Sequence, residues 1–466
     1  MMRRIGRTPQ VHNSDVVPVS FERGFDLGLL EYLSWRGDLN FEDFPLNEVD
    51  GMVFSRLVYA PFDLVLGKGD IEEYGGAVPK MYMEETDGTE GEQEVSIDEV
   101  MQTEDLKPEI KITVLPETEV QEEDKIEESA SEDKLEKPAK TEKTRARLLR
   151  DVMDEILNTE GFREHLLDPQ DEALIRAVKD SARYEMLTVS DFIDYISEDE
   201  ESQFCGMTLH ISGDFNIVVF RGTDDTFLGW KENFNMGFVN PLGCQLHGLN
   251  YLNIVGAGVH GDLVLCGHSK GGNISCYAGA FCDYSIQERI TKIYSYDSPG
   301  YMDSVLESEG YGRICDRIRT FVPQSSLIAM ILGHKEPFII IHSIDNQTFH
   351  QHNLFTWEVE RDMLVRETDT TDASKVFDNS LKAWLDAMEQ PKRIKFVDGM
   401  YALVTQMKLK KLSDVKKIPV PERVRQTLDA MKTLDPETRA VITEGIKLMF
   451  ASYIESKNSL AHKASR

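Results

Sequence analysis

The sequence of 466 residues lacks the signals of a disulfide-stabilised, zinc-binding or membrane-spanning protein. Its six cysteines are scattered and never form a C-x-x-C pair, so neither a zinc site nor a disulfide framework is indicated. No apolar run reaches the roughly 18 residues that a membrane-spanning helix needs. The basic start, "MMRRIGRTPQVHNSD", lacks the apolar segment of a secretory signal. These absences predict a protein of the reducing cytoplasm.

Positive charge is also scarce, because 51 Lys and Arg stand against 82 Asp and Glu, a formal net charge of −31. Such a charge argues against nucleic acids and polyanionic membrane surfaces as partners. About half of the excess lies in residues 84–140, which have 21 acidic and 6 basic residues and few aromatics. This segment cannot bury enough apolar surface to offset its ordering entropy, so we expect a disordered insertion. An acidic arm for an unidentified partner is the alternative.

The rest of the chain has the composition of a folded protein, since 41% of all residues are hydrophobic and 9% are aromatic. Residues 1–83 contain two helical patterns and predict a helical cap, whereas residues 366–466 predict a C-terminal helical region. In residues 141–365 short β-rich runs alternate with helices, which predicts an α/β core with a mostly parallel sheet covered by helices. The strand candidates are 207–212, 215–223, 262–267, 292–297, 317–323 and 338–344.

The stretch "VLCGHSKGGNIS" (264–275) follows a buried-strand pattern with a glycine-flanked serine, Ser269. Gly267 and Gly271 would relieve the crowding of a sharp turn that lifts this serine out of the sheet. The helix that follows would aim its first N–H groups at the same place, where they stabilise negative charge. We therefore predict that Ser269 is a nucleophile. The alternative is a glycine-rich strand-to-helix turn without chemistry.

A serine nucleophile also needs an oxyanion hole made of backbone N–H groups. One donor would be the amide of Lys270, the residue after the nucleophile. The segment "VVFRGTDDT" (218–226) is a strand that ends in Arg-Gly-Thr, and Gly222 would permit a turn that points the Thr223 amide into the site. Thr223 and Lys270 are thus the predicted oxyanion residues.

These motifs occur in a recognisable order: "FRGTDDTFLGWKENFNMGF", then "QLHGLNYL", then "LVLCGHSKGGNIS". Together they resemble the class 3 lipases. The sequence is still more similar to a group of bacterial lipase-like α/β-hydrolases marked by "FRGTDD", "GW", "GHSKGGN", a D-x-P-G after the next strand and "QH" near a tryptophan. Here the last four marks lie at Trp230, 267–273, 297–301 and 351–357.

The resemblance covers roughly residues 21–66 and 180–360. It implies an α/β-hydrolase fold and a serine esterase or lipase-like activity, with a lipid or acylglycerol ester as substrate. His352 in "QHNLFTW" matches the family's histidine and follows the nucleophile in the chain order of this fold.

The triad acid is harder to place. Class 3 lipases have an Asp in a turn where this chain reads "FVPQSS" (321–326), without a carboxylate. Asp297 ends the preceding strand candidate, at the sheet edge where the site should lie, and we predict that it orients His352. The alternative is that Asp297 only caps the turn after it. Asp224 and Asp225 are interpreted as turn or cap residues.

Three residues are candidates for substrate contact. Trp230 and Phe234 belong to the apolar segment 227–240, which could line an acyl pocket or form a lid, although ordinary core packing is equally compatible. His268 precedes the nucleophile and should point away from the site, so packing is favoured for it.

The sequence as a whole predicts a serine hydrolase that cleaves a carboxylic ester without a metal or an organic cofactor. A thioesterase or peptidase is a rival within the same chemistry. The alternative from another class is an inactive hydrolase-fold protein that binds a partner, which the missing carboxylate in "FVPQSS" keeps open.

Overall fold

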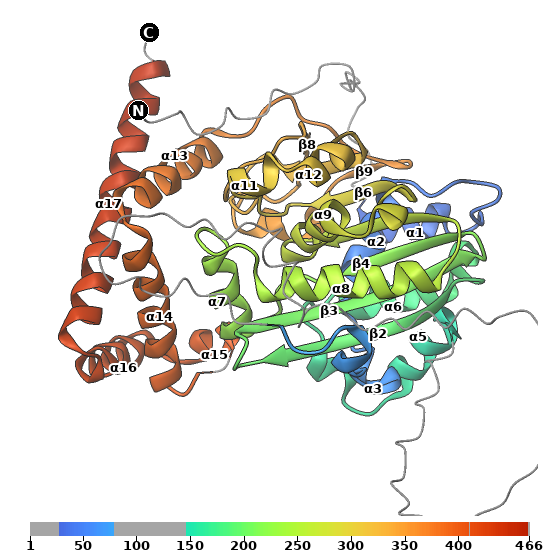
Figure 1. Ribbon diagram of the computed structural model, residues 1–466, viewed down its shortest axis with the longest axis horizontal. Coiled ribbons are helices and arrows are strands. Elements are labelled where there is room, and N and C mark those ends of the chain that lie inside the picture. The colour runs from blue at the N-terminus through green and yellow to red at the C-terminus, as the bar shows by residue number, and fades with distance from the viewer. Residues whose placement is uncertain (1–27, 79–145, 410, 465–466) are drawn as a thin grey trace, which may run out of the picture. The chain divides into compact units, whose positions relative to one another are not determined.

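The computed structural model describes residues 28–78, 146–409 and 411–464, so the acidic segment 84–140 lies outside the described residues. An eight-stranded sheet with strand order β1 to β8 lies at its centre (Figure 1). The first four strands pair antiparallel, and β4 to β8 pair parallel. The strands are β1 (Arg147–Leu148), β2 (Thr188–Ser197), β3 (Ser202–Ser212), β4 (Phe215–Phe220), β5 (Asp262–His268), β6 (Ile290–Tyr296), β7 (Ile318–Pro323) and β8 (Phe338–Ile341).

The sheet confirms the predicted α/β fold class, and the described helices connect and flank its strands. Before β2 lie α1 (Leu29–Arg36), α2 (Glu48–Leu57), α3 (Asp63–Leu66), α5 (Leu149–Asn158) and α6 (Asp171–Asp180). Between β4 and β7 lie α7 (Phe227–Asn235), α8 (Gly243–Gly258), α9 (Lys270–Phe281), α10 (Tyr284–Gln287), α11 (Asp303–Leu306) and α12 (Glu309–Ile314). A separate hairpin pairs β9 (Val359–Glu360) with β10 (Met363–Leu364).

Sequence patterning does not reveal β2, although the hairpin of β3 and β4 and the strands β5 to β8 lie where they are predicted. The pairing of β2 with β3 shifts register between Ser190 and Ile193, and Asp191 between them has a positive φ of 54°. Such a bulge adds a residue to one strand and breaks the alternation of apolar and polar positions. Strand patterns are recognised by that alternation, so β2 has no clear signal in the sequence.

Helices cover both faces of the parallel strands because alternate side chains of a strand point to opposite faces. Val264 and Cys266 of β5 belong to the core that α2 shares with the sheet. Leu265, on the other face, lies against Gly279 of α9, where an added Cβ would come within 3.2 Å of its side chain. The helices α2 and α9 therefore enclose the strand that leads to Ser269.

The N-terminal helices belong to the same core as the sheet, although residues 79–145 separate them in the sequence. Asp50 of α2 forms a fully buried ion pair with Arg183 at 2.6 Å, and Arg56 forms a bidentate pair with Asp171 of α6. A buried guanidinium with its carboxylate fixes orientation because two parallel hydrogen bonds must align.

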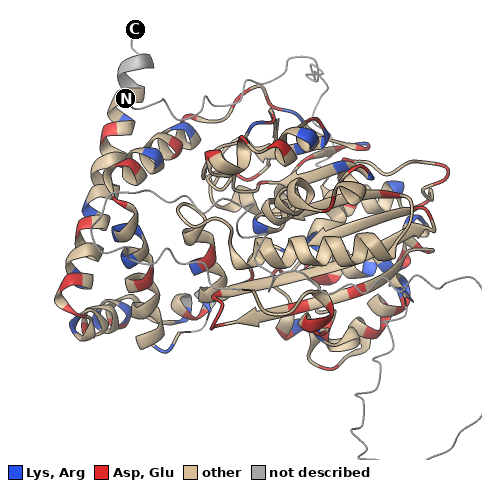
Figure 2. Cartoon of the chain, in the orientation of Figure 1, with Lys and Arg blue, Asp and Glu red and all other residues tan. Residues whose placement is uncertain are grey.

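The C-terminal helices extend the fold beyond the sheet (Figure 1). They are α13 (Asp372–Ala387), α14 (Gln390–Gln406), α15 (Leu412–Lys417), α16 (Val420–Thr433) and α17 (Pro436–Ala464). Phe238, after α7, shares an apolar cluster with Trp384 of α13, Phe396 of α14 and Val441 of α17. Charged residues are frequent on these helices and sparse on the strands of the sheet (Figure 2). No helix in the described ranges is both long and apolar enough to cross a bilayer.

Candidate active site

Ser269 lies at a sharp turn between β5, which ends at His268, and α9, which begins at Lys270. Its backbone has φ 57° and ψ −131°, a strained conformation for a residue with a side chain. The Ser269 amide donates to the carbonyl of Tyr296 in β6 at 2.9 Å, which ties the turn to the next strand. The strain is thus held in place by the sheet, as in a nucleophile elbow.

Glycines around the turn permit its close packing. A Cβ on Gly267 would lie 2.2 Å from the carbonyl carbon of Gly271, and a Cβ on Gly271 would lie 2.1 Å from the carbonyl oxygen of Phe220 in β4. A Cβ on Gly222 would lie 3.1 Å from that of Ser269. The loop after β4 and the start of α9 therefore approach each other at backbone contact distance, with Ser269 beside them.

The two predicted oxyanion residues lie on these two segments. Within the described residues, neither the Thr223 amide nor the Lys270 amide donates a hydrogen bond to a protein acceptor. The hydroxyl of Thr223 donates to Asn233 Oδ1 of α7 at 2.9 Å. The side chain of Lys270 is fully buried and paired with Glu232 of α7 at 2.5 Å, so its ammonium is not available to a substrate.

His352 and Asp297 are hydrogen-bonded to each other. His352 Nδ1 lies 2.7 Å from Asp297 Oδ2. Asp297 follows β6, is 1% exposed, and donates its own amide to the carbonyl of Phe321 in β7 at 2.8 Å. His352 ends the short 3₁₀ helix His350–His352, and 24% of its side chain is exposed. The contact orients the imidazole and leaves its Nε2 side free of the carboxylate.

The other carboxylate oxygen of Asp297 accepts the hydroxyl of Ser326. Ser326 Oγ in turn accepts the amide of Ala329 at 3.0 Å. Ser326 belongs to "FVPQSS", so the segment that lacks a carboxylate supplies a hydroxyl to Asp297. This role of Ser326 was not predicted, because nothing in the sequence pattern distinguishes it from Ser325.

Within the described part of the chain, Ser269 and His352 share no hydrogen bond, although His268, the neighbour of Ser269, contacts His352 directly. The ring of His268, next to the serine, lies 4.4 Å from the ring of His352 between centroids. In serine hydrolases without substrate the bond from nucleophile to base is often long and tightens in the reacting complex.

The ring of His268 forms a hydrogen bond with the backbone of His352. The Nε2 of His268 donates to the backbone carbonyl of His352 at 2.9 Å, and Tyr59 Oη lies 3.3 Å from its Nδ1. Because a carbonyl only accepts, Nε2 must have the proton, and the neutral ring then accepts at Nδ1. Burial is the main cause that lowers the pKa of His268, and the nearby His352 lowers it further. Both ring nitrogens are therefore bonded to protein groups rather than offered to a substrate.

Comparison with known proteins finds one family model that matches part of the chain. A family model described as Mbeg1-like matches residues 178–402, a range that includes Ser269, Asp297 and His352. This match confirms the resemblance to lipase-like hydrolases. No curated protein matches the sequence.

One solved structure similar to this chain is a crystal structure of M37 lipase. The sequence identity is 11% and the TM-score is 0.25, over 38% of this chain and 65% of the lipase chain. The chain thus covers less than two thirds of that lipase.

The two remaining candidates for substrate contact lie on α7. Trp230 is half-buried, and Phe234 is 54% exposed. Within the described ranges, no group of three or more His, Cys, Asp or Glu side chains is arranged to hold a metal ion. All six cysteines are free thiols.

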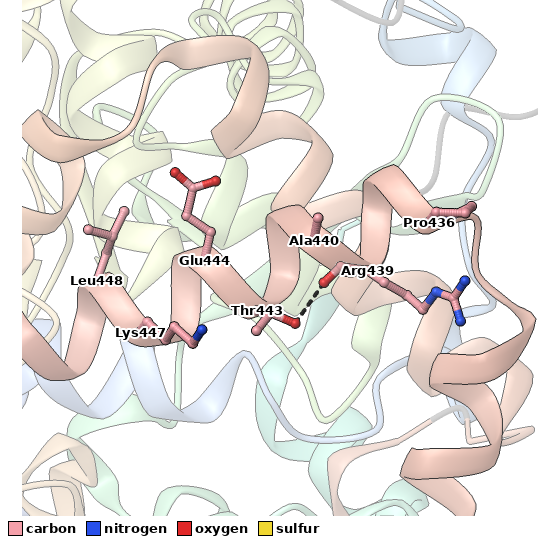
Figure 3. A pocket seen from close by; sticks show the side chains of 7 residues that line it. All are labelled: Pro436, Arg439, Ala440, Thr443, Glu444, Lys447 and Leu448. Carbon is pink, nitrogen blue, oxygen red and sulfur yellow. Dashed lines mark hydrogen bonds between the residues drawn. The ribbon is translucent and has the colours of Figure 1, made fainter.

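Two cavities lie outside the cluster around Ser269. A hollow of about 720 Å³ lies along one side of α17 (Figure 3). It is lined by Pro436, Arg439, Ala440, Thr443, Glu444, Lys447 and Leu448. A cavity of about 300 Å³ lies between α13 and the loops after β6 and β7. Ala329, which donates to Ser326, is in its lining. The second cavity is therefore connected to Asp297 through Ala329 and Ser326.

Proposed function

We propose that this protein is a serine hydrolase that cleaves a carboxylic ester, with Ser269 as nucleophile, His352 as base and Asp297 as the orienting acid. The observation on which the proposal depends is the 2.7 Å contact between His352 Nδ1 and the buried carboxylate of Asp297. A strained serine at the end of the neighbouring strand, and two segments with unbonded amides beside it, add support.

The reaction needs no group outside the chain except water. Ser269 Oγ attacks the ester carbonyl carbon while His352 Nε2 takes its proton, and the carbonyl oxygen becomes an oxyanion. The amides of Thr223 and Lys270 donate to that oxyanion. Collapse breaks the bond to the alcohol, which leaves with the proton from His352. Water then attacks the acyl-enzyme while His352 takes its proton, and His352 returns that proton to Ser269 Oγ as the carboxylic acid departs.

Asp297 acts through its negative charge and through its position beside His352 Nδ1. A carboxylate at Nδ1 holds the tautomer in which Nε2 accepts the serine proton, and it stabilises the imidazolium that follows. The hydroxyl of Ser326 supplies a hydrogen bond to the second oxygen of this buried carboxylate. Buried charged groups need such partners, since desolvation otherwise favours the neutral form.

The proposed substrate class is a small lipid or acylglycerol ester, in keeping with the lipase-like family. Phe234 and Trp230 of α7 would contact its apolar part. Rates of hydrolysis of thioesters and peptides, measured beside those of oxygen esters, distinguish this substrate class from its rivals. The cytoplasmic location remains a prediction from the cysteine content.

Labelling with a fluorophosphonate probe tests the proposal, since the probe reacts with an activated serine whatever the natural substrate. The parent protein should be labelled and should hydrolyse short p-nitrophenyl esters. Ser269→Ala should lose both while keeping its circular dichroism and Tm, because loss of a triad nucleophile removes several orders of magnitude from kcat.

Ser275→Ala is the matched control. This serine lies on the same helix, is buried, and bonds the carbonyl of Gly271 at 2.8 Å. The control should keep full labelling. A folded parent that is neither labelled nor active would refute the enzyme and favour the inactive, partner-binding alternative.

A further inference from the structure

The residue after the proposed nucleophile is a lysine whose side chain is fully buried. Lys270 Nζ donates to the backbone carbonyl of Gln203 in β3 at 2.9 Å and to Glu232 Oε2 at 2.5 Å. Both side chains of this ion pair are nearly inaccessible, at 0% and 2% exposure. The pair joins the start of α9 to α7 and to β3.

Glu232 is held by further donors. Its Oε1 accepts the hydroxyl of Ser202 at 3.1 Å and the amide of Cys244 at 2.9 Å, and its Oε2 accepts the amide of Gln203 at 3.2 Å. Each donor comes from a different position on β3 or α8. The carboxylate therefore has a single well-defined orientation, and the ammonium bonded to it has one as well.

Stability alone does not account for such a pair. Removing two charges from water costs several kcal/mol each, and buried ion pairs replaced by apolar residues of similar volume often leave a protein equally stable or more stable. An apolar side chain would fill the space of the Lys270 stem equally well. What an apolar residue cannot supply is direction, because hydrogen bonds have preferred angles and apolar contacts do not.

The same cluster also holds the second oxyanion segment. Gln203 Oε1 accepts the amide of Asp224, the residue after Thr223, at 3.4 Å. The hydroxyl of Thr223 bonds Asn233, the neighbour of Glu232 on α7. Gln203 and α7 are thus connected to both segments that carry an unbonded amide beside Ser269.

We infer that Glu232 is a positioning residue which, through Lys270 and Gln203, sets the separation of the two oxyanion amides. The inference rests on the proposed function. Removing the pair leaves the His352–Asp297 hydrogen bond intact but lets the amides of Lys270 and Thr223 drift relative to each other. Stabilisation of the oxyanion depends on donors held at hydrogen-bond distance from one point, so it is lost before substrate binding is.

The test uses the double variant Lys270→Met/Glu232→Gln of the full chain. It removes both charges together, so no buried charge is left unpaired, and the carbonyl oxygen of the glutamine keeps an acceptor for the amide of Cys244. Three quantities are measured: Tm, kcat and KM for p-nitrophenyl butyrate, and the dissociation constant of phenylboronic acid. The serine adduct of a boronic acid places an oxygen where the oxyanion forms.

We expect the double variant to fold with a Tm near that of the parent, with KM within about threefold and kcat lower by about 10- to 100-fold. Affinity for phenylboronic acid should fall by a similar factor. A folded double variant with kcat and boronate affinity within twofold of the parent overturns the inference. So does a loss of kcat that is matched by an equal rise in KM, since that indicates general loosening of the site.

Lys231→Met is the matched control. Lys231 is the neighbour of Glu232 on α7 and is also buried, but its ammonium bonds Glu201 at 2.7 Å and Asp398 of α14 at 2.6 Å. The same substitution there should leave kcat at the parental value. The Ser269-dependent labelling of the parent tests the proposed function separately, so these kinetics report on the ion pair alone.

Discussion

The Nδ1 atom of His352 lies 2.7 Å from the Oδ2 atom of Asp297, although the two residues are 55 positions apart in the sequence. Asp297 follows β6, and Ser269 follows the adjacent parallel strand β5. Carboxyl ends of parallel strands lie at one edge of a sheet, which is where α/β proteins bind their ligands. The acid and the serine thus share an edge, and the loop with His352 crosses to it from beyond β8.

Asp297→Asn should keep the fold and lower kcat by about 10³- to 10⁴-fold. The amide would hold the imidazole in the wrong tautomer and would not stabilise its charged form. Steady-state kinetics with a p-nitrophenyl ester, together with Tm, provide the measurement. A loss below about threefold with unchanged stability would place the acid elsewhere and favour a dyad or an inactive homologue.

Ser326→Ala should lower kcat by about tenfold, because the hydroxyl that bonds Asp297 Oδ1 is lost and a hydrogen bond to a charged group contributes about 1.5–3 kcal/mol. The change in kcat should exceed any change in KM. Ser325→Ala is the control, since that hydroxyl bonds Thr371 rather than Asp297. Equal kinetics for the two variants would mean that Ser326 does not support the acid.

His268→Phe should lower kcat by about tenfold through loss of the 2.9 Å hydrogen bond that holds the backbone carbonyl of His352. The shape of the pH–rate profile should not change, because burial lowers the pKa of His268 and keeps the ring neutral at the pH of the assay. A variant whose profile loses an ionisation would show that His268 itself titrates in the reaction.

We expect the lowered pKa of Glu336 to make part of the free energy of unfolding sensitive to acid. Burial by itself raises its pKa, but the charge and hydrogen bond of His334, with bonds from Thr320 and Tyr311, outweigh burial and lower the pKa from 4.5 to about 2. A lowered folded-state pKa means that this stabilisation is complete above about pH 4.5 and is lost as the pH falls towards 2.

Urea unfolding at several pH values measures this effect. Glu336→Gln should be less stable near neutral pH and should show a shallower loss of stability between pH 4.5 and 2 than the parent. Glu309→Gln, at a side chain that is 90% exposed, should follow the parent. Parallel pH curves for the parent and Glu336→Gln would contradict the expectation.

Local patterns were enough to predict the elements that present Ser269. A short apolar run, a serine between glycines and a helical pattern are contiguous in the sequence, so their order alone indicates a strand, a turn and a helix. The β3–β4 hairpin is also local, because its turn residues and alternating flanks are neighbours in the chain. The bulged β2 has no such local signal, since its register depends on pairing with β3 and not on its own pattern.

Contacts between distant segments could not be read in the same way. Asp297 was a candidate acid that could equally have capped a turn, and only the packing of β6, β7 and the His352 loop puts its carboxylate against the imidazole. The hydroxyl of Ser326 and the pairing of Lys270 with Glu232 had no signal in the sequence. Local propensities act over a few residues, whereas these contacts depend on how the sheet brings separate strand ends and helices together, a geometry that exists only once the core is packed.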